Sequence, residues 1–217
     1  MRTLPIAVLI SGGGTNLQAL IDACADAKFP AEIKLVLSNR PKAGGLDRAK
    51  KAGIPTAVVD HKDFDTREEF ESALQSVLEA SDVELICLAG FMRILNGSFV
   101  NNWKDRMINI HPSLLPSFKG LHTHERAIES GVRFAGCTVH YVRAEMDDGP
   151  IIIQAVVPID ADETPDSLAA KVLTYEHQIY PESLRLIANR LTRVRGHRVM
   201  IDHMPVPKNG LINPIPE

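Results

Sequence analysis

The sequence has few of the features that mark secreted, membrane-spanning or nucleic-acid-binding proteins. Its three cysteines lie far apart and form no Cys-x-x-Cys pair, which predicts buried free thiols in a reducing compartment. The amino-terminal apolar run is short and broken by glycines, so neither a signal peptide nor a membrane-spanning segment is expected. The formal net charge of −3 argues against a large polyanion as partner. We therefore expect a cytoplasmic protein with no membrane or nucleic acid partner, and a small anion held by local geometry stays an open alternative.

The composition is that of an ordinary globular protein. Its 217 residues are 45% hydrophobic and 24% charged, so a sizeable core can form without a disulfide or a metal. No internal repeat and no linker-like stretch divides the chain. We therefore expect a single domain over residues 1–217, with one half over about 1–100, a second over about 101–190, and a loosely ordered tail over about 204–217.

Short apolar runs alternate with helical patterns in the first half. We expect strands at 5–10, 32–38, 55–59 and 83–90, and helices at 17–27, 45–53 and 66–80. Thr66 and Glu69 fit a capping box at the start of the last of these helices. The alternation predicts an α/β fold, in which a Rossmann-like, mostly parallel sheet is flanked by helices.

The pattern changes after a further strand at 107–111. Two runs at 136–142 and 151–157 read as strands joined by a turn, which predicts an antiparallel C-terminal strand pair added to the parallel sheet. A long helix is expected over about 165–190, with Pro165 in its first turn.

The glycine-rich segment "SGGGTN" (11–16) lies between the first expected strand and helix. Glycines there allow backbone N–H groups to approach an anion at the start of a helix. The spacing is not G-x-G-x-x-G and no P-loop lysine follows, so a single phosphate group is favoured over a dinucleotide. The alternative is a tight turn in which Thr15 or Asn16 caps the helix.

Two segments, an expected strand end and an expected turn, carry polar side chains that could take part in chemistry. In "INIHPSLLP" (108–116), Asn109 and His111 are two residues apart and point to the same face of a strand. "EMDDGP" (145–150) carries Asp147 in good turn chemistry. The alternatives are a half-buried histidine that caps the strand and a plain acidic turn. Together, an amide, an imidazole and a carboxylate can stabilise an oxyanion and move a proton.

Other candidate chemistry is weaker. No serine or cysteine lies in a nucleophile elbow, so a covalent acyl-enzyme is not expected. His122 and His124 lack a third ligand with convincing spacing, so we expect no metal site. His140 alternates with apolar neighbours on a strand and is interpreted as structural.

The combined motifs resemble the folate-dependent formyltransferases. The likeness runs in order from about residue 5 to residue 190 and is carried by "VLISGGGTNLQALIDA", "LAGFMRIL", "NIHPSLLP", "GLHTHERAIESG", "MDDGPIIIQ" and "YEHQIYP". The phosphate loop and the "LHTH" segment resemble the members that formylate glycinamide ribonucleotide in purine biosynthesis. The resemblance implies direct formyl transfer from 10-formyltetrahydrofolate, a consumed co-substrate, through a tetrahedral intermediate.

The resemblance also implies roles for individual residues. Asn109 would donate to the oxyanion, and His111, as imidazolium, would stabilise it and help deliver a proton. Asp147 would pair with His111 and organise water for proton transfer. The ribonucleotide phosphate would be held by Gly14, Thr15 and Asn16, with Glu176 binding polar groups of the same substrate. The folate site would be lined by Arg67, Met92, Arg93, Ile94, Leu95, Asn109, Arg143, Ala144, Glu145, Met146 and Asp147.

Two departures and three alternatives accompany this resemblance. Family members often have Asn at the position of Gly13, a change that spares backbone donors, and some have a polar residue where Leu173 stands, so that contact is in doubt. A formyltetrahydrofolate hydrolase would use the same trio but usually has an additional amino-terminal domain. A methionyl-tRNA formyltransferase would need an RNA-binding domain. A small-molecule binding module would need only the glycine loop. Monomer and homodimer both stay open.

Overall fold

The computed structural model describes residues 2–202, 205 and 207–213, so the tail expected over about 204–217 lies partly outside the described residues. The elements in chain order are β1 (Leu4–Ile10), α1 (Thr15–Cys24), β2 (Ala31–Ser38), α2 (Gly44–Lys51), β3 (Thr56–Val58), η1 (His61–Asp63), α3 (Arg67–Ala80), β4 (Leu85–Leu88), α4 (Gly97–Asn102), β5 (Met107–His111), α5 (Thr123–Glu129), β6 (Phe134–Tyr141), β7 (Ile151–Pro158), α6 (Pro165–Ala188), β8 (Thr192–Arg195) and β9 (Arg198–Ile201).

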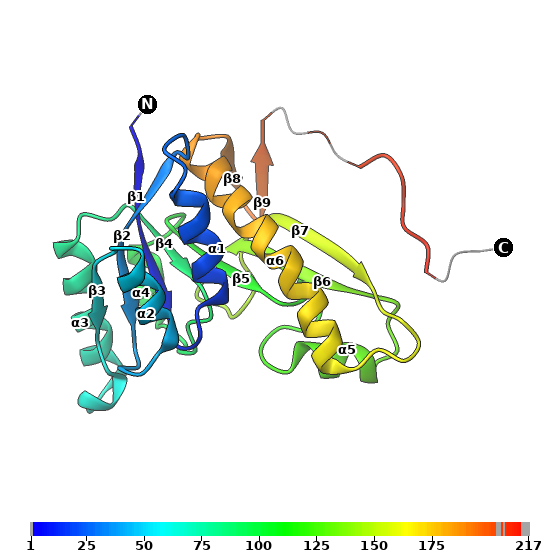
Figure 1. Ribbon diagram of the computed structural model, residues 1–217, viewed down its shortest axis with the longest axis horizontal. Coiled ribbons are helices and arrows are strands. Elements are labelled where there is room, and N and C mark those ends of the chain that lie inside the picture. The colour runs from blue at the N-terminus through cyan, green and yellow to red at the C-terminus, as the bar shows by residue number, and fades with distance from the viewer. Residues whose placement is uncertain (1, 203–204, 206, 214–217) are drawn as a thin grey trace.

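The strands form a mixed sheet whose order is β3-β2-β1-β4-β5-β6-β7-β9-β8 over the described residues (Figure 1). The first five strands of this order pair in parallel, and β6 pairs antiparallel with both β5 and β7. β7 pairs in parallel with β9, which pairs antiparallel with β8. Strand order reverses at β1, which has β2 on one side and β4 on the other. In such sheets the crevice beyond the carboxyl ends of the strands at the reversal is the usual place for ligands.

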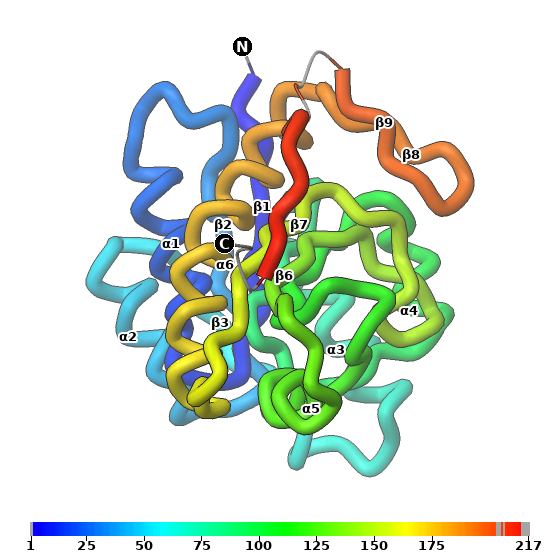
Figure 2. The backbone as a smooth tube through the Cα atoms, turned by 90° about the vertical axis from the view of Figure 1, so that its right-hand side faces the viewer, coloured from blue at the N-terminus to red at the C-terminus, as the bar shows by residue number. Residues whose placement is uncertain are grey.

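Helices cover both faces of the sheet because side chains alternate along each strand. Ile6, Val8 and Ile10 of β1 belong to a core with α1 and α6, whereas Ala7 and Leu9 belong to a second core with α3 and α4. Figure 2 shows α1 and α6 on one side of the strands and α3 and α4 on the other. The expected α/β fold with flanking helices and an antiparallel strand pair is confirmed.

Local signals placed the starts of two helices, α3 and α6. Thr66 and Glu69 make both bonds of the predicted capping box, and Pro165 lies in the first turn of α6. The sequence did not predict α4, α5 or the β8–β9 hairpin, which extends the sheet beyond β7 through a single Ile151–Arg198 pairing. Within the described ranges, no helix is both long enough and apolar enough to cross a bilayer.

The predicted thiols are free cysteines. Cys87 and Cys137 are buried and Cys24 is partly buried. Burial raises the pKa of the Cys24 and Cys137 thiols to about 12, so both are protonated and inert at neutral pH.

Candidate active site

The glycine loop leads directly from the carboxyl end of β1 into α1. Gly14 is the N-cap, with φ 73°, and a Cβ there would lie 2.7 Å from the Gly45 Cα. Glycine is therefore required by both conformation and space. Among the described residues, no side chain caps this helix end, so the alternative in which Thr15 or Asn16 caps α1 is wrong. The first-turn N–H groups are directed at whatever lies beyond the helix start.

Helix α6 approaches the same loop from the other half of the chain. The Asn16 Nδ2 donates to the Glu176 Oε2 at 2.6 Å, although the two residues are far apart in sequence. Burial raises the pKa of the Glu176 carboxyl, and the bond from Asn16 offsets part of that rise. The buried Oδ1 of Asn16 has no partner among the described residues. Leu173 lies one turn before Glu176 on the same helix.

Arg48 of α2 supports the loop from outside. Its Nε donates to the Gly13 carbonyl at 2.8 Å and its Nη1 to the Gln18 Oε1 at 3.2 Å. A cavity of about 720 Å³ lies here, lined by Gly13, Gln18, Gly44, Asp47, Arg48, Lys51 and Ala52. A Cβ on Gly13 would meet open space, so a side chain at that position would leave the backbone donors in place.

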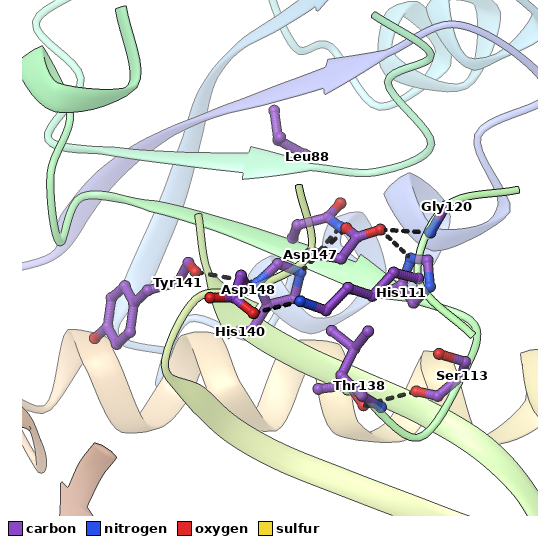
Figure 3. A network of polar contacts seen from close by, with 12 residues as sticks. Leu88, His111, Ser113, Gly120, Thr138, His140, Tyr141, Asp147 and Asp148 are labelled. Atoms are coloured by element: carbon purple, nitrogen blue, oxygen red, sulfur yellow. Dashed lines mark hydrogen bonds and ion pairs between the residues drawn. The ribbon is translucent and has the colours of Figure 1, made fainter. Parts of the chain in front are cut away.

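The predicted imidazole and carboxylate, of His111 and Asp147, lie together at the end of β5 (Figure 3), and His140 connects them to the predicted amide of Asn109. Asn109 and His111 lie on β5, opposite His140 and Thr138 of the antiparallel β6. The His111 Nδ1 lies 3.5 Å from the Asp147 Oδ2, and both side chains are largely buried. The chain therefore brings together residues that are 147 − 111 = 36 positions apart.

Both ring nitrogens of His111 face acceptors. Besides the Asp147 carboxylate at Nδ1, the Phe118 carbonyl lies 3.1 Å from Nε2. The Gly120 N–H donates to the Asp147 Oδ2 at 2.9 Å, and Lys119 forms an ion pair with Asp148. These contacts dock the loop after β5 on the acidic turn, and the Phe118 carbonyl of the same loop accepts from the ring Nε2.

His140, interpreted from the sequence as structural, lies in this cluster. Its Nδ1 lies 3.0 Å from the Tyr141 carbonyl, so Nδ1 carries the hydrogen and Nε2 accepts from the Asn109 Nδ2 at 3.2 Å. Burial lowers the pKa of His140 to about 4, so this ring is neutral at physiological pH. Its Nε2 is also 3.8 Å from the Asp147 Oδ1. His140 therefore orients the Asn109 amide.

The acidic turn is shaped by backbone geometry at two positions. Asp147 has φ 52°, in the left-handed region, where aspartate is tolerated better than most residues. A Cβ on Gly149 would lie 1.6 Å from the Tyr141 carbonyl oxygen, so only glycine allows the turn to fold back on the end of β6. This fold-back aims the Asp147 carboxylate at His111.

The two segments expected to bind folate face each other near this cluster. A Cβ on Gly97 would lie 3.3 Å from the Ala144 Cβ, which places the 92–97 and 143–147 segments side by side. Met92, Ile94 and Met146 are exposed, at 58%, 65% and 55% of their surface. Such exposure of large apolar side chains is typical of a surface that covers a ligand.

The remaining residues expected at the folate site differ in position. Leu95 is buried in the core with α3 and α4. The Arg67 Nη1 donates to the Asn96 Oδ1 at 3.3 Å, so Arg67 lies at the end of the 92–95 segment. Arg143 pairs with Asp105, and Arg93 and Glu145 are exposed. Within the described residues, no group of three His, Cys, Asp or Glu side chains is arranged to hold a metal.

Comparisons with known proteins agree on one family. A family profile described as "Formyl transferase" matches residues 4–184. The chain is 42% identical over 205 residues to a phosphoribosylglycinamide formyltransferase of Escherichia coli (strain K12), covering 94% of this chain and 97% of that protein. It is 51% identical over 184 residues to the human trifunctional purine biosynthetic protein adenosine-3, covering 85% of this chain but only 18% of that protein. The crystal structure of glycinamide ribonucleotide transformylase 1 from Symbiobacterium toebii superposes with a TM-score of 0.89 at 45% identity, covering 92% of this chain and 94% of that one.

Proposed function

The chain belongs to the formyl transferase family, and from that membership we propose that it transfers a formyl group from 10-formyltetrahydrofolate to the amine of glycinamide ribonucleotide. The observation that carries the proposal is the convergence of Asn109, His111 and Asp147 at the same edge of the sheet as an uncapped, glycine-built helix start. An anion site next to an oxyanion-stabilising cluster suits a phosphorylated substrate that presents an amine to an acyl donor.

In the proposed reaction, the amine nitrogen attacks the formyl carbon and the carbonyl π electrons move to oxygen. Asn109 donates to that oxygen through an amide that His140 orients. His111, as imidazolium, stabilises the oxyanion and helps deliver a proton to the folate nitrogen, which takes the electron pair of the broken carbon–nitrogen bond. Asp147 pairs with His111 and organises water that takes a proton from the attacking amine.

Each substrate has its own set of residues in the proposal. Gly14, Thr15 and Asn16 hold the ribonucleotide phosphate through backbone N–H groups, and Glu176 accepts hydrogen bonds from polar groups of the same substrate. The folate lies against a surface formed by Arg67, Met92, Arg93, Ile94, Leu95, Asn109, Arg143, Ala144, Glu145, Met146 and Asp147.

The wider setting follows from the same proposal. The chain is one formyltransferase domain in which the phosphate-binding half spans about 1–100 and the catalytic and folate half about 101–190. Folate is a co-substrate, and the chemistry needs no metal because a protonated imidazole and an amide supply the electrophilic groups. The protein works in the cytoplasm on small molecules, without a nucleic acid or membrane partner, as a monomer or homodimer.

One assay tests the proposal against its rivals. The protein is supplied with 10-formyltetrahydrofolate and either glycinamide ribonucleotide, water alone or charged tRNA, and release of tetrahydrofolate is followed. His111→Ala protein prepared in the same way serves as the blank for contaminating activity. Release that requires glycinamide ribonucleotide supports the proposal. Equal release in water would instead indicate the hydrolase, release only with tRNA would indicate the tRNA formyltransferase, and no release would indicate a binding module.

A further inference from the structure

Ser11 occupies the point where the two substrate regions meet. It follows the last residue of β1 and directly precedes the glycines of the loop. Its N–H donates to the Gly90 carbonyl at 3.1 Å, across the junction between β1 and the segment after β4. Because β1 and β4 flank the reversal of strand order, this junction is the seam at which ligands bind in such sheets.

The Ser11 hydroxyl makes two further bonds in the protein interior. Its Oγ accepts the Met92 N–H at 2.7 Å and donates to the Asn39 Oδ1 at 2.5 Å. Ser11 is 4% exposed and Asn39 fully buried, so neither bond competes with water. Met92 is the first residue of the 92–95 segment in the proposed folate surface, and therefore one hydroxyl joins the two substrate segments.

Asn39 sets the direction of that hydroxyl. The Asn39 side chain lies at the end of β2, with Oδ1 toward Ser11 and Nδ2 3.3 Å from the His61 Nδ1. The Asn39 oxygen takes the Ser11 hydrogen, which leaves an oxygen lone pair of Ser11 for the Met92 N–H. The bond from Met92 is therefore kept in one orientation by Asn39, which itself lies outside both the glycine loop and the folate segment.

The other end of the folate segment has a separate anchor. The Asn96 N–H donates to the Glu71 Oε1 of α3 at 2.6 Å, and Glu71 is buried. Glu71 contacts nothing of the glycine loop in the contacts described for it, so it fixes the folate segment alone. The segment is thus held at one end by α3 and at the other by Ser11, which belongs to the loop.

We propose that Ser11 is a positioning residue that couples ribonucleotide binding to folate binding, because its hydroxyl ties the glycine loop to Met92, the first residue of the folate segment. This inference rests on the proposed function. An anion bound at the glycine loop restrains the backbone that carries Ser11, and through the Ser11 hydroxyl it restrains the Met92 N–H, so the second substrate meets a segment already in place. Coupling of this kind is reciprocal, and each substrate then tightens the binding of the other by the same factor.

The test measures that factor in a complex that cannot react. Tetrahydrofolate, which has no formyl group, is titrated by calorimetry into the protein with and without saturating glycinamide ribonucleotide. We expect wild-type protein to bind tetrahydrofolate at least about fivefold more tightly when the ribonucleotide is present, the lower end of typical coupling. In Ser11→Ala the ratio should fall to within about twofold of one, and in Asn39→Ala it should lie between the two, since the Met92 bond survives without its orienting partner.

Two control variants separate coupling from general loosening. Ser183→Ala removes another buried serine hydroxyl, which donates to the Ile179 carbonyl within α6, and should leave the ratio at the wild-type value. Glu71→Ala releases the other end of the folate segment, so tetrahydrofolate should bind more weakly with and without ribonucleotide while the ratio persists. Thermal unfolding of each variant checks that the fold is intact.

The outcomes separate this inference from the proposed function. A wild-type ratio of one, or a Ser11→Ala ratio equal to that of wild type, would overturn the coupling while both ligands still bind. Loss of the ratio in Glu71→Ala as well would overturn it too, because the Ser11 link would then have no special part. If wild-type protein binds neither ligand, the proposed function fails and the coupling falls with it.

Discussion

The glycine loop and the proposed catalytic cluster of Asn109, His111 and Asp147 lie at the same edge of the sheet but are built in different ways. The loop offers backbone N–H groups from consecutive residues, 12–16, at the start of one helix. The cluster offers side chains from β5, from β6 and from the turn that follows β6. Deletion of one side chain should therefore remove a reacting group from the cluster, whereas the loop should be sensitive mainly to changes that move its backbone.

The largest effect is expected at the centre of the cluster. His111→Ala removes the imidazole that lies 3.5 Å from the Asp147 carboxylate. We expect kcat to fall at least about 100-fold, the usual loss on removing a proton-transfer group, with the Kd of glycinamide ribonucleotide little changed. Steady-state kinetics and calorimetry measure the two quantities. Retention of more than about a tenth of kcat would remove His111 from the proposed mechanism.

The second-largest effect is expected at Asp147, and its neighbour Asp148 provides the comparison. Asp147→Asn keeps an oxygen that can accept the Gly120 N–H but removes the charge beside His111. We expect kcat to fall roughly tenfold or more, about 1.4 kcal/mol of transition-state stabilisation, and the pH–rate profile to change. Asp148→Asn, which removes an exposed acid paired with Lys119, should leave kcat near the wild-type value. Equal losses in the two variants would mean that the turn acts only through its fold.

The features that the sequence predicted best are those in which the partners are close in the chain. The capping box of Thr66 and Glu69 spans four residues, and Pro165 acts at the first turn of its own helix. Asn109 and His111 share a strand face because side chains alternate. These relations depend on local geometry alone, so they can be read without knowing the fold.

The features that the sequence missed depend on register and on distant contacts. The place of His140 in the cluster requires the β5–β6 register, which sets it opposite Asn109, and no local signal gives that register. The bond between Ser11 and Met92 requires β1 and β4 to be neighbours. The β8–β9 hairpin has two four-residue strands rich in arginine, too short for a reliable alternation.

A change to the loop backbone should affect ribonucleotide binding more than kcat, the opposite of what is expected for the cluster. Gly14→Ala places a Cβ 2.7 Å from the Gly45 Cα at a residue with φ 73°. We expect a loss of about 1–3 kcal/mol in the free energy of unfolding and a raised KM for the ribonucleotide, with kcat reduced less than in His111→Ala. Gly13→Ala, where the Cβ meets open space, is the matched control and should change both little. Urea unfolding and kinetics give the values, and a normal ribonucleotide KM in Gly14→Ala would contradict the phosphate assignment.

A side chain that supports the loop should have a smaller effect. Arg48→Ala removes the bonds to the Gly13 carbonyl and to Gln18. One hydrogen bond typically contributes about 0.5–1.5 kcal/mol. If that much binding free energy is lost, the ribonucleotide KM should rise about two- to tenfold while kcat stays unchanged. Lys51→Ala removes a cation from the same helix and cavity without touching the Gly13 carbonyl. If the two variants raise KM equally, Arg48 acts through its charge alone and not by holding the loop.

The smallest effect is expected on the pH dependence of stability, at Glu176, whose side chain reaches the glycine loop from α6. Burial raises the pKa of Glu176 above its ordinary value of 4.5. Because the folded pKa is the higher one, Glu176 contributes stability below about pH 4.5, and that contribution is lost as pH rises through the folded pKa. Glu176→Gln cannot titrate but keeps an oxygen for the Asn16 amide. The free energy of unfolding should therefore fall less between about pH 4.5 and pH 7.5 in the variant than in the wild type.

Urea unfolding at both pH values measures this, with Glu182→Gln, on the same helix and paired with Arg185, as the control. An unchanged pH dependence in Glu176→Gln would show that the buried carboxylate is as well stabilised in the fold as in water, and that Asn16 compensates fully for its burial.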